Sequence, residues 1–348
     1  MIYYILLIII ITIVWLLIKL LNLKNGEKLF LKVAFLLLIL FAALRSENVG
    51  TDLRNYKIFY ELVNSFSLTK LLTLFEPGYA LYSFALFNIS KGSFQFLLIV
   101  TSIFTLIGPY YFIKENSNNY FLSVIVYICL SFYIFTFSGL RQSIALSILL
   151  LSLKFVKNKK FYSFILCIAL AFCFHKSAII FLPTYFLNKI EIKNRQFPFL
   201  LILGLGVFIS RYFIVSKLTM FFYDNYALLN NTGGGYQLLT IFIIIFILLT
   251  MFKKRIIESN RNNNLWYNMF YIGIIIQIIA TVEGNANRAA SYYTLPLILL
   301  IPYFVNTFQL KQRKIVSLVI YTVMIALFII SLNGSSLVNT YEFFWHLQ

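Results

Sequence analysis

Arg141 is the one charged residue of the stretch FTFSGLRQSIA, which lies between two long apolar runs. A guanidinium group matches phosphate oxygens in pairs, so Arg141, with Gln142 as an added donor, is a candidate anion site. The alternative is an arginine at the end of a membrane span, whose side chain reaches the interface and does nothing more.

The stretch EGNANR is a second polar group and holds Glu283, Asn287 and Arg288. Amides, a carboxylate and a guanidinium within six residues suit sugar hydroxyls and phosphate. The alternative is a polar loop with a local pair between the glutamate and the arginine.

His175 and Lys176 interrupt another apolar run, CIALAFCFHKSAIIFLP. Beside a reacting hydroxyl the histidine would accept a proton, and beside phosphate it would act as a cation. The alternative is a hydrogen-bonded residue at a helix end.

Two carboxylates, Asp52 and Glu76, are candidates to deprotonate a hydroxyl group. Asp52 lies in the stretch GTD, which also suits a turn. Glu76 precedes Pro77, which also suits the acidic start of a helix.

The composition indicates the kind of fold that positions these residues. Of the 348 residues, 61% are hydrophobic and only 11% are charged, whereas a soluble domain is about half apolar and about a quarter charged. The apolar runs are continuous rather than alternating, which indicates helices and not barrel strands. The expected fold is therefore an all-α polytopic integral membrane protein. The net charge of +18 follows the positive-inside pattern, so it does not indicate a nucleic-acid partner.

Basic clusters give the expected topology. If all face the cytoplasm, each apolar interval between them holds an even number of spans, about 12 in total, with both termini outside. The clusters are 19–32, 114–119, 154–160, 188–195, 252–261 and 309–314. Segment 75–90 fits only as a re-entrant or surface helix on the outer face. We expect one transmembrane domain over 1–348, with outer loops about 45–92 and 216–236 forming the rim of the active site.

The outer face of this topology carries several cations against the positive-inside bias, which suggests that they have a function. They are Arg45, Arg54, Arg141, Lys176 and Arg288. Tyr56 and Tyr79 belong to the same face, where tyrosines either contact sugar rings or form an ordinary interfacial belt.

The three cysteines lie in apolar segments at spacings that suit neither a metal site nor a disulfide framework. The sequence holds no acidic metal motif, so we expect a metal-independent reaction without a cofactor.

The order of the motifs GTDLRNYKIFY, FEPGY, FSGLRQSIALSI, LAFCFHKSAIIFLP and NRAASYY resembles the EpsG family, the Wzy-like membrane proteins of bacterial exopolysaccharide or capsule synthesis. The resemblance implies a glycosyltransferase of the bacterial plasma (inner) membrane. It would move a growing glycan from undecaprenyl diphosphate to the non-reducing end of the next lipid-linked repeat. Membrane lipid, a chain-length regulator and a flippase of the same pathway are the other expected partners.

The residues carried over fall into two groups. The expected catalytic residues are Asp52, Glu76, Arg141, His175 and Arg288. The expected substrate-binding residues are Arg45, Tyr56, Tyr79, Gln142, Lys176, Glu283 and Asn287.

Other functions stay open. A transporter or flippase of the lipid-linked oligosaccharide usually carries its ionisable groups near the midplane and often has repeated halves, neither of which is seen in the sequence. A membrane acyltransferase would take its donor from the cytoplasmic side, away from His175. A ligase that moves finished polymer would use nearly the same chemistry as a polymerase.

Overall fold

The computed structural model describes residues 1–192, 196–222, 234–334 and 340–347, which form helices and no β-strand beyond one isolated bridge. The all-helical prediction is thereby confirmed for the described part of the chain. The α-helices are α1 Ile2–Leu20, α2 Gly26–Ala43, α3 Leu53–Leu62, α4 Leu68–Leu74, α5 Pro77–Ser90, α6 Phe94–Asn116, α7 Tyr120–Cys129, α8 Phe132–Ser138, α9 Leu140–Lys157, α10 Phe161–Phe174, α11 Thr184–Leu187, α12 Phe197–Phe222, α13 Tyr236–Met251, α14 Lys253–Ser259, α15 Asn263–Ala280, α16 Ala286–Thr294, α17 Leu297–Asn306 and α18 Leu310–Gly334. The 3-10 helices are η1 Val63–Ser65, η2 Lys176–Phe181 and η4 Phe344–Leu347.

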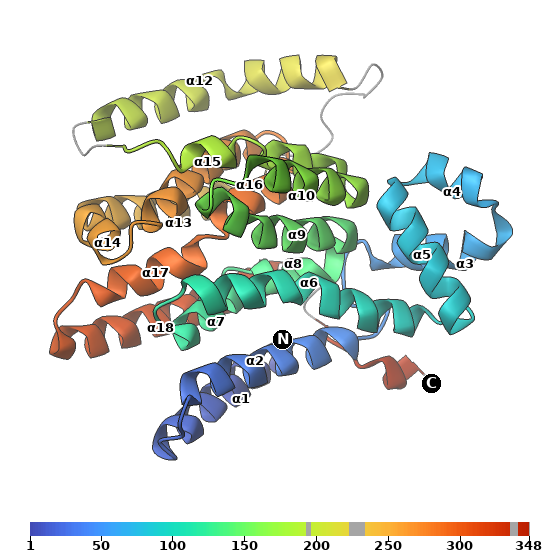
Figure 1. Ribbon diagram of the computed structural model, residues 1–348, viewed down its shortest axis with the longest axis horizontal. Helices are drawn as coiled ribbons and strands as arrows, with labels where there is room; N and C mark the ends of the chain where they lie inside the picture. Colours follow the sequence, from blue (N-terminus) through green and yellow to red (C-terminus); the bar gives the residue numbers. More distant parts are fainter. Residues whose placement is uncertain (193–195, 223–233, 335–339, 348) are drawn as a thin grey trace. The chain divides into compact units, whose positions relative to one another are not determined.

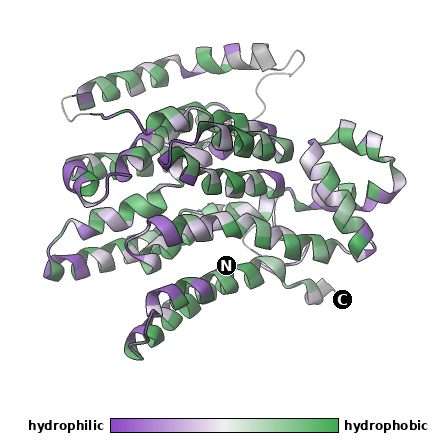
Figure 2. Ribbon diagram, viewed as in Figure 1, coloured by the Kyte–Doolittle hydropathy of each residue, from purple (hydrophilic) through white to green (hydrophobic). Residues whose placement is uncertain are grey.

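Among the described residues, four helices are long and apolar enough to cross a membrane, namely α1, α6, the 197–217 part of α12 and the 310–333 part of α18. Counting each of three bent helix pairs as one span raises the number to seven. Figure 2 shows the long helices hydrophobic over most of their length, with hydrophilic residues gathered toward their ends and in the connections. The chain is a multi-pass membrane protein, and the count of about 12 spans stays a prediction.

The chain divides into two compact units, the first formed by Met1–Leu182 with Leu310–Gln348 and the second by Pro183–Gln309. The first unit contains α1 to α10 and α18, and the second contains α11 to α17. The single transmembrane domain expected over 1–348 stays a prediction.

Helix α6 is central to the first unit because it packs against both α2 and α9 (Figure 1). The backbone of α6 approaches α9 closely at Gly108, whose N–H donates to Oγ of Ser147 at 2.8 Å. A Cβ atom at Gly108 would lie 2.4 Å from the carbonyl oxygen of Ser147, so only glycine permits this approach. The close packing fixes α9, which carries Arg141 at its first turn.

The segment after α2 folds into three short helices, α3, α4 and α5, which lie together near the Phe94 end of α6 (Figure 1). Their aromatic residues form a core with α6 and α9 in which Tyr60, Tyr79, Leu97 and Leu140 are fully buried. Helix α5 has 14 residues, fewer than the roughly 20 that cross a bilayer. Its placement as a re-entrant or surface helix on the outer face stays a prediction.

The break before α9 lies where the sequence predicted it. Helix α8 ends at Ser138, and Gly139 separates it from α9. A second break, at Leu130 and Ser131, was not predicted and bends α7 against α8 by 48°. Together the two breaks direct the start of α9 toward the three short helices.

The C-terminal segment lies back on the end of α2. The N–H of Ser46 donates to the carbonyl of Glu342 at 2.8 Å, and the N–H of Phe344 donates to that of Leu44 at 3.0 Å. These bonds form the isolated bridge between Arg45 and Phe343. The segment therefore lies against Arg45, which follows the end of α2.

Candidate functional site

Glu76 lies at the centre of the site, immediately before the first residue of α5. Pro77 opens the helix, as the sequence allowed, but the Glu76 side chain makes no capping bond to it. Gly78 follows, and a Cβ atom there would lie 2.8 Å from the carbonyl oxygen of Cys173 in α10. The glycine therefore lets the start of α5 approach the end of α10, where His175 lies.

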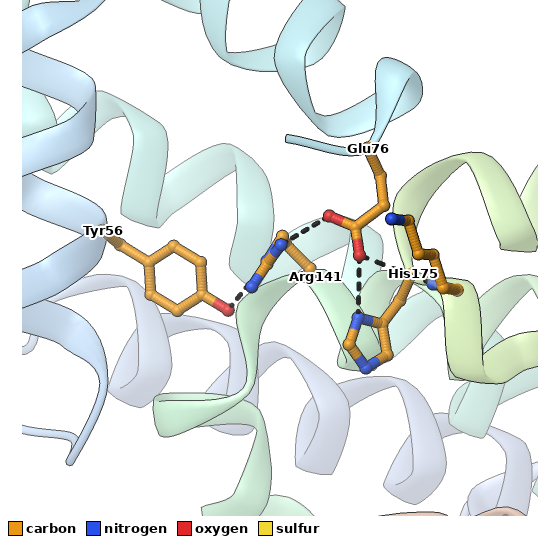
Figure 3. Close-up of polar contacts among 5 residues, drawn as sticks. Tyr56, Glu76, Arg141 and His175 are labelled. Carbon is orange, nitrogen blue, oxygen red and sulfur yellow. Dashed lines mark hydrogen bonds and ion pairs between the residues drawn. The ribbon is translucent and has the colours of Figure 1, made fainter. Parts of the chain in front are cut away.

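Arg141 reaches Glu76 from the first turn of α9. Its Nη1 donates to Oε2 of Glu76, and its Nε donates to the hydroxyl of Tyr56 in α3 at 3.4 Å (Figure 3). The Arg141 side chain is 27% exposed, against 8% for Glu76. The guanidinium is thus held on two sides while part of it stays open, which leaves further N–H donors for a ligand.

His175 and the backbone of Lys176 contact the other carboxylate oxygen. His175 Nδ1 lies 3.4 Å from Oε1 of Glu76, an ion-pair distance rather than a well-formed hydrogen bond (Figure 3). The N–H of Lys176 donates to the same oxygen at 3.5 Å. Because Nδ1 faces Glu76, Nε2 is the ring nitrogen left for a reaction partner.

Three aromatic rings surround the Arg141 guanidinium. Its Cζ lies 5.3 Å from the ring centroid of Phe75, 5.8 Å from that of Tyr56 and 5.9 Å from that of Tyr79. These distances allow cation–π attraction. These attractions orient the guanidinium. Phe75 was not singled out from the sequence, although it directly precedes Glu76.

The carboxyl group of Glu76 is strongly acidic. Burial alone would raise its pKa, but the contacts with His175 and Arg141 outweigh burial and lower the pKa of Glu76 to about 2. The carboxylate is therefore ionised throughout the neutral range. It acts as a fixed negative charge between two cationic or basic side chains.

Asp52 lies at the start of α3, one turn before Tyr56. The hydroxyl of Thr51 donates to its Oδ1 at 3.3 Å, and the residue is partly exposed. This placement fits the turn that the sequence suggested. It also leaves Asp52 close in sequence to a residue that contacts Arg141.

Arg45, an expected substrate-binding residue, is enclosed by the fold, and its contact with a substrate stays a prediction. Its side chain is 1% exposed, donates to the carbonyl of Ala42 and to Oγ of Ser102 at 3.4 Å, and lies 4.8 Å over the ring of Phe137. Burial lowers the pKa of Arg45 to about 10, which leaves it charged at neutral pH. The C-terminal segment encloses this residue, so it ties helices together and presents no open surface to a substrate.

Two other predicted substrate-binding residues are also enclosed. Tyr79 is 0% exposed and Gln142 is 3% exposed. Tyr79 supports the Arg141 guanidinium from the side of α5, and Gln142 faces the interior of the first unit. Direct contact of either with a substrate stays a prediction.

Glu283, Asn287 and Arg288 belong to the second unit. Glu283 accepts from the N–H of Ala286 at 3.1 Å and from Nδ2 of Asn285 at 3.0 Å, so it caps the start of α16. Arg288 lies in the first turns of α16 and is partly exposed. The structure therefore brings Glu76, Arg141, His175, Lys176 and Tyr56 together in the first unit, whereas the α16 group belongs to the second unit.

The sequence analysis missed Gln277, a 1% exposed amide in α15. Its Nε2 donates to Oδ1 of Asn287 at 2.6 Å and to the carbonyl of Gly235 at 3.3 Å. A single amide within the apolar run GIIIQIIA was the available signal, because a buried amide needs hydrogen-bond partners.

Two further expectations concern the loop 216–236 and a metal site. Of the loop 216–236, residues 223–233 lie outside the described residues, so its role as a rim stays a prediction. Within the described ranges, no group of three or more His, Cys, Asp or Glu side chains has an arrangement that could hold a metal ion.

Comparison with known proteins identifies the family. The model of the EpsG family matches residues 28–345, almost the whole chain. No curated protein and no solved structure matches the sequence. The chain therefore belongs to the EpsG family, and this membership indicates an exopolysaccharide polymerase-like membrane protein.

Proposed function

We propose that the protein is a polysaccharide polymerase of the bacterial plasma membrane. It transfers a growing glycan from undecaprenyl diphosphate to the non-reducing end of the next lipid-linked repeat at the outer face. The observation that carries the proposal is the partly open Arg141 guanidinium, held by Glu76 and Tyr56 beside His175 in a chain of the EpsG family.

Arg141 serves the leaving group. In the transfer, the bond from the anomeric carbon of the growing glycan to the diphosphate oxygen breaks, and negative charge develops on the diphosphate. A fixed guanidinium in a partly dry site stabilises such charge better than water does, because it need not reorient. Lys176, an exposed residue whose backbone N–H donates to Glu76, is the proposed second cation for the diphosphate.

His175 serves the acceptor. The acceptor hydroxyl oxygen forms the new bond to the anomeric carbon, and its proton passes to a base, a role worth about 10²–10⁴-fold in rate. Asp52 and Glu76 were the first candidates from the sequence. A carboxyl group with a pKa of about 2 that already faces Arg141 and His175 is a weak base. We assign proton transfer to Nε2 of His175, with Asp52 as the alternative, and assign Glu76 the positioning of both neighbours.

The lipid explains the need for a membrane fold, because the undecaprenyl tail stays in the bilayer while the sugars reach the outer aqueous layer. Arg288, with Asn287 and Glu283, is the proposed second contact for diphosphate or sugar hydroxyls. A flippase that supplies the repeat and a regulator of chain length are the proposed partners in the pathway.

Purified protein in lipid, supplied with synthetic undecaprenyl-diphosphate repeats, tests the proposal. A polymerase produces a ladder of products that differ by one repeat and remain lipid-linked. The same vesicles report movement of the lipid-linked repeat between leaflets. The repeat supplied should be the one found in the host's own polymer. If this repeat moves between leaflets but no ladder forms, the result contradicts the proposal and favours a flippase.

A further inference from the structure

A cavity opens between the ends of α6 and α9, away from the site around Arg141. Its volume is about 270 Å³, and its polar lining comes from Glu115 and Asn116 of α6 and from Lys154 and Lys157 of α9. Both helices belong to the first unit and are held together at Gly108 and Ser147. Lys154 follows Arg141 by 13 residues, which at a rise of about 1.5 Å per residue separates them by about 20 Å along α9.

The two lysines lie one helical turn apart and differ in how they are held. Lys157 Nζ donates to Oδ1 of Asn116 at 2.7 Å, and Asn116 donates in turn to the carbonyl of Phe112 at 2.8 Å. One of the three N–H donors of Lys157 is thereby used, and its ammonium group is fixed at the wall of the cavity. Lys154 is exposed at the rim.

The charge of the lining favours one negative charge. Lys154 and Lys157 contribute two positive charges and Glu115 contributes one negative charge. The neighbouring Lys114 is not part of this lining; its Nζ lies over the rings of Tyr110 and Tyr111, at 5.7 and 5.1 Å from their centroids. A phosphodiester, which carries a single negative charge, matches this balance better than a diphosphate does.

An apolar stripe leads along α6 to the cavity. Ile103, Phe104, Ile107 and Tyr111 are 45%, 50%, 40% and 38% exposed, and their spacing places them along one face of the helix. Tyr111 also lines the cavity, together with Leu150 and Leu151 of α9. A ligand that fills the cavity and continues along this face therefore has an anionic head and a hydrocarbon tail.

We infer that the cavity between the ends of α6 and α9 binds the headgroup phosphate of an anionic glycerophospholipid, with an acyl chain along the exposed face of α6. The basic cluster 154–160 places this end at the cytoplasmic leaflet in the expected topology, where anionic lipids attract lysines near the surface. The site is separate from the one proposed for the polymerase reaction, and its test does not depend on that reaction.

The test measures binding of phosphatidylglycerol and phosphatidylcholine to the delipidated full-length protein by native mass spectrometry. The variant Lys154→Gln/Lys157→Gln removes both cavity lysines. The matched control Lys159→Gln/Lys160→Gln removes two exposed lysines that follow α9, so the net charge is the same in both variants.

We expect the wild type to prefer phosphatidylglycerol, the cavity variant to bind it about tenfold more weakly, and the control to bind it as the wild type does. Equal losses in the two variants would overturn the inference and indicate diffuse charge attraction. No loss in a folded cavity variant would overturn it too, since the lysines would then only complement the ends of the helices. Lysine-dependent binding of inorganic phosphate without any preference for phosphatidylglycerol would overturn the assignment to a lipid.

Discussion

The Nη1 atom of Arg141 donates a hydrogen bond to Oε2 of Glu76, although 65 residues separate the two in the chain. The bond joins the start of α9 to the start of α5, and Tyr56 of α3 and His175 at the end of α10 complete the group. Four segments therefore depend on one carboxylate for their relative placement. Removing its charge affects both the fold and the reaction.

The stability of the protein should depend on the ionisation of Glu76. Its pKa is lowered from 4.5 to about 2 on folding, so the stabilisation is fully present above about pH 4.5 and is lost as the pH falls toward about 2. We expect Glu76→Gln to lower the thermal midpoint at about pH 7, and the difference from the wild type to shrink below about pH 4.5. Thermal unfolding in detergent across this range measures the difference.

The control for that experiment is Glu61→Gln, which changes a carboxylate that is 57% exposed and pairs with Lys57 on the surface of α3. An exposed pair of this kind contributes little to stability. A Glu76→Gln effect that stayed constant with pH, or that Glu61→Gln reproduced, would contradict the account of the ion pair.

Variants of His175 and Asp52 test which of the two residues is the general base. His175→Ala should reduce kcat by about 10²-fold or more, because a general base contributes about 10²–10⁴-fold, while KM changes little. Asp52→Asn should reduce kcat by less than about tenfold. Single-turnover transfer to a synthetic acceptor measures both, and a larger loss in Asp52→Asn would move the role of base to Asp52.

Several features of the fold could be predicted because polar residues interrupt apolar runs. The sequence divided the chain at Gly139, at His175 with Lys176 and at 284–288, and α9, η2 and α16 begin at or beside these positions. In each case a glycine or a charged group lies where a continuous helix through the bilayer would be unfavourable. Local composition is sufficient to predict breaks of this kind.

The bend between α7 and α8 could not be predicted in the same way. It lies inside the run YICLSFYIF, and Ser131 adopts a φ of 62°, which a serine rarely does without tertiary support. The Oγ atoms of Ser131 and Ser331 lie 3.2 Å apart, a contact with a distant segment that the run itself does not indicate.

Arg45 shows a different limit. Its position on the outer side of the expected topology suggested a functional cation, but the side chain is buried beside the bridge to Phe343. Nothing near Arg45 or Phe343 in the sequence indicates that the two residues are in contact. The pairing of Glu76 with Arg141 was beyond prediction for the same reason, although each residue had been singled out.

Arg45 should therefore matter for stability more than for substrate affinity. Arg45→Met removes the donors to Ala42 and Ser102 and the contact with Phe137, and we expect a loss of about 1–3 kcal/mol. Denaturant unfolding measures it, with the exposed Arg54→Met as the matched control. Unchanged stability together with a raised KM would restore the substrate contact first expected of Arg45.

The reaction should not depend on a divalent metal, because Arg141 and Lys176 supply the positive charge that the diphosphate needs. We expect an excess of a chelator to leave the rate of ladder formation within about twofold of its untreated value. Loss of activity that added Mg²⁺ or Mn²⁺ restored would contradict this and require a metal at the diphosphate.

The most direct measurement compares Arg141→Ala with Arg54→Ala in the ladder assay. Each variant removes one arginine from the first unit, but only Arg141 contacts Glu76 and Tyr56. The account predicts that Arg54→Ala forms the full ladder and that folded Arg141→Ala forms none. A full ladder from Arg141→Ala would contradict the account and leave Arg141 as an arginine that only reaches the membrane interface.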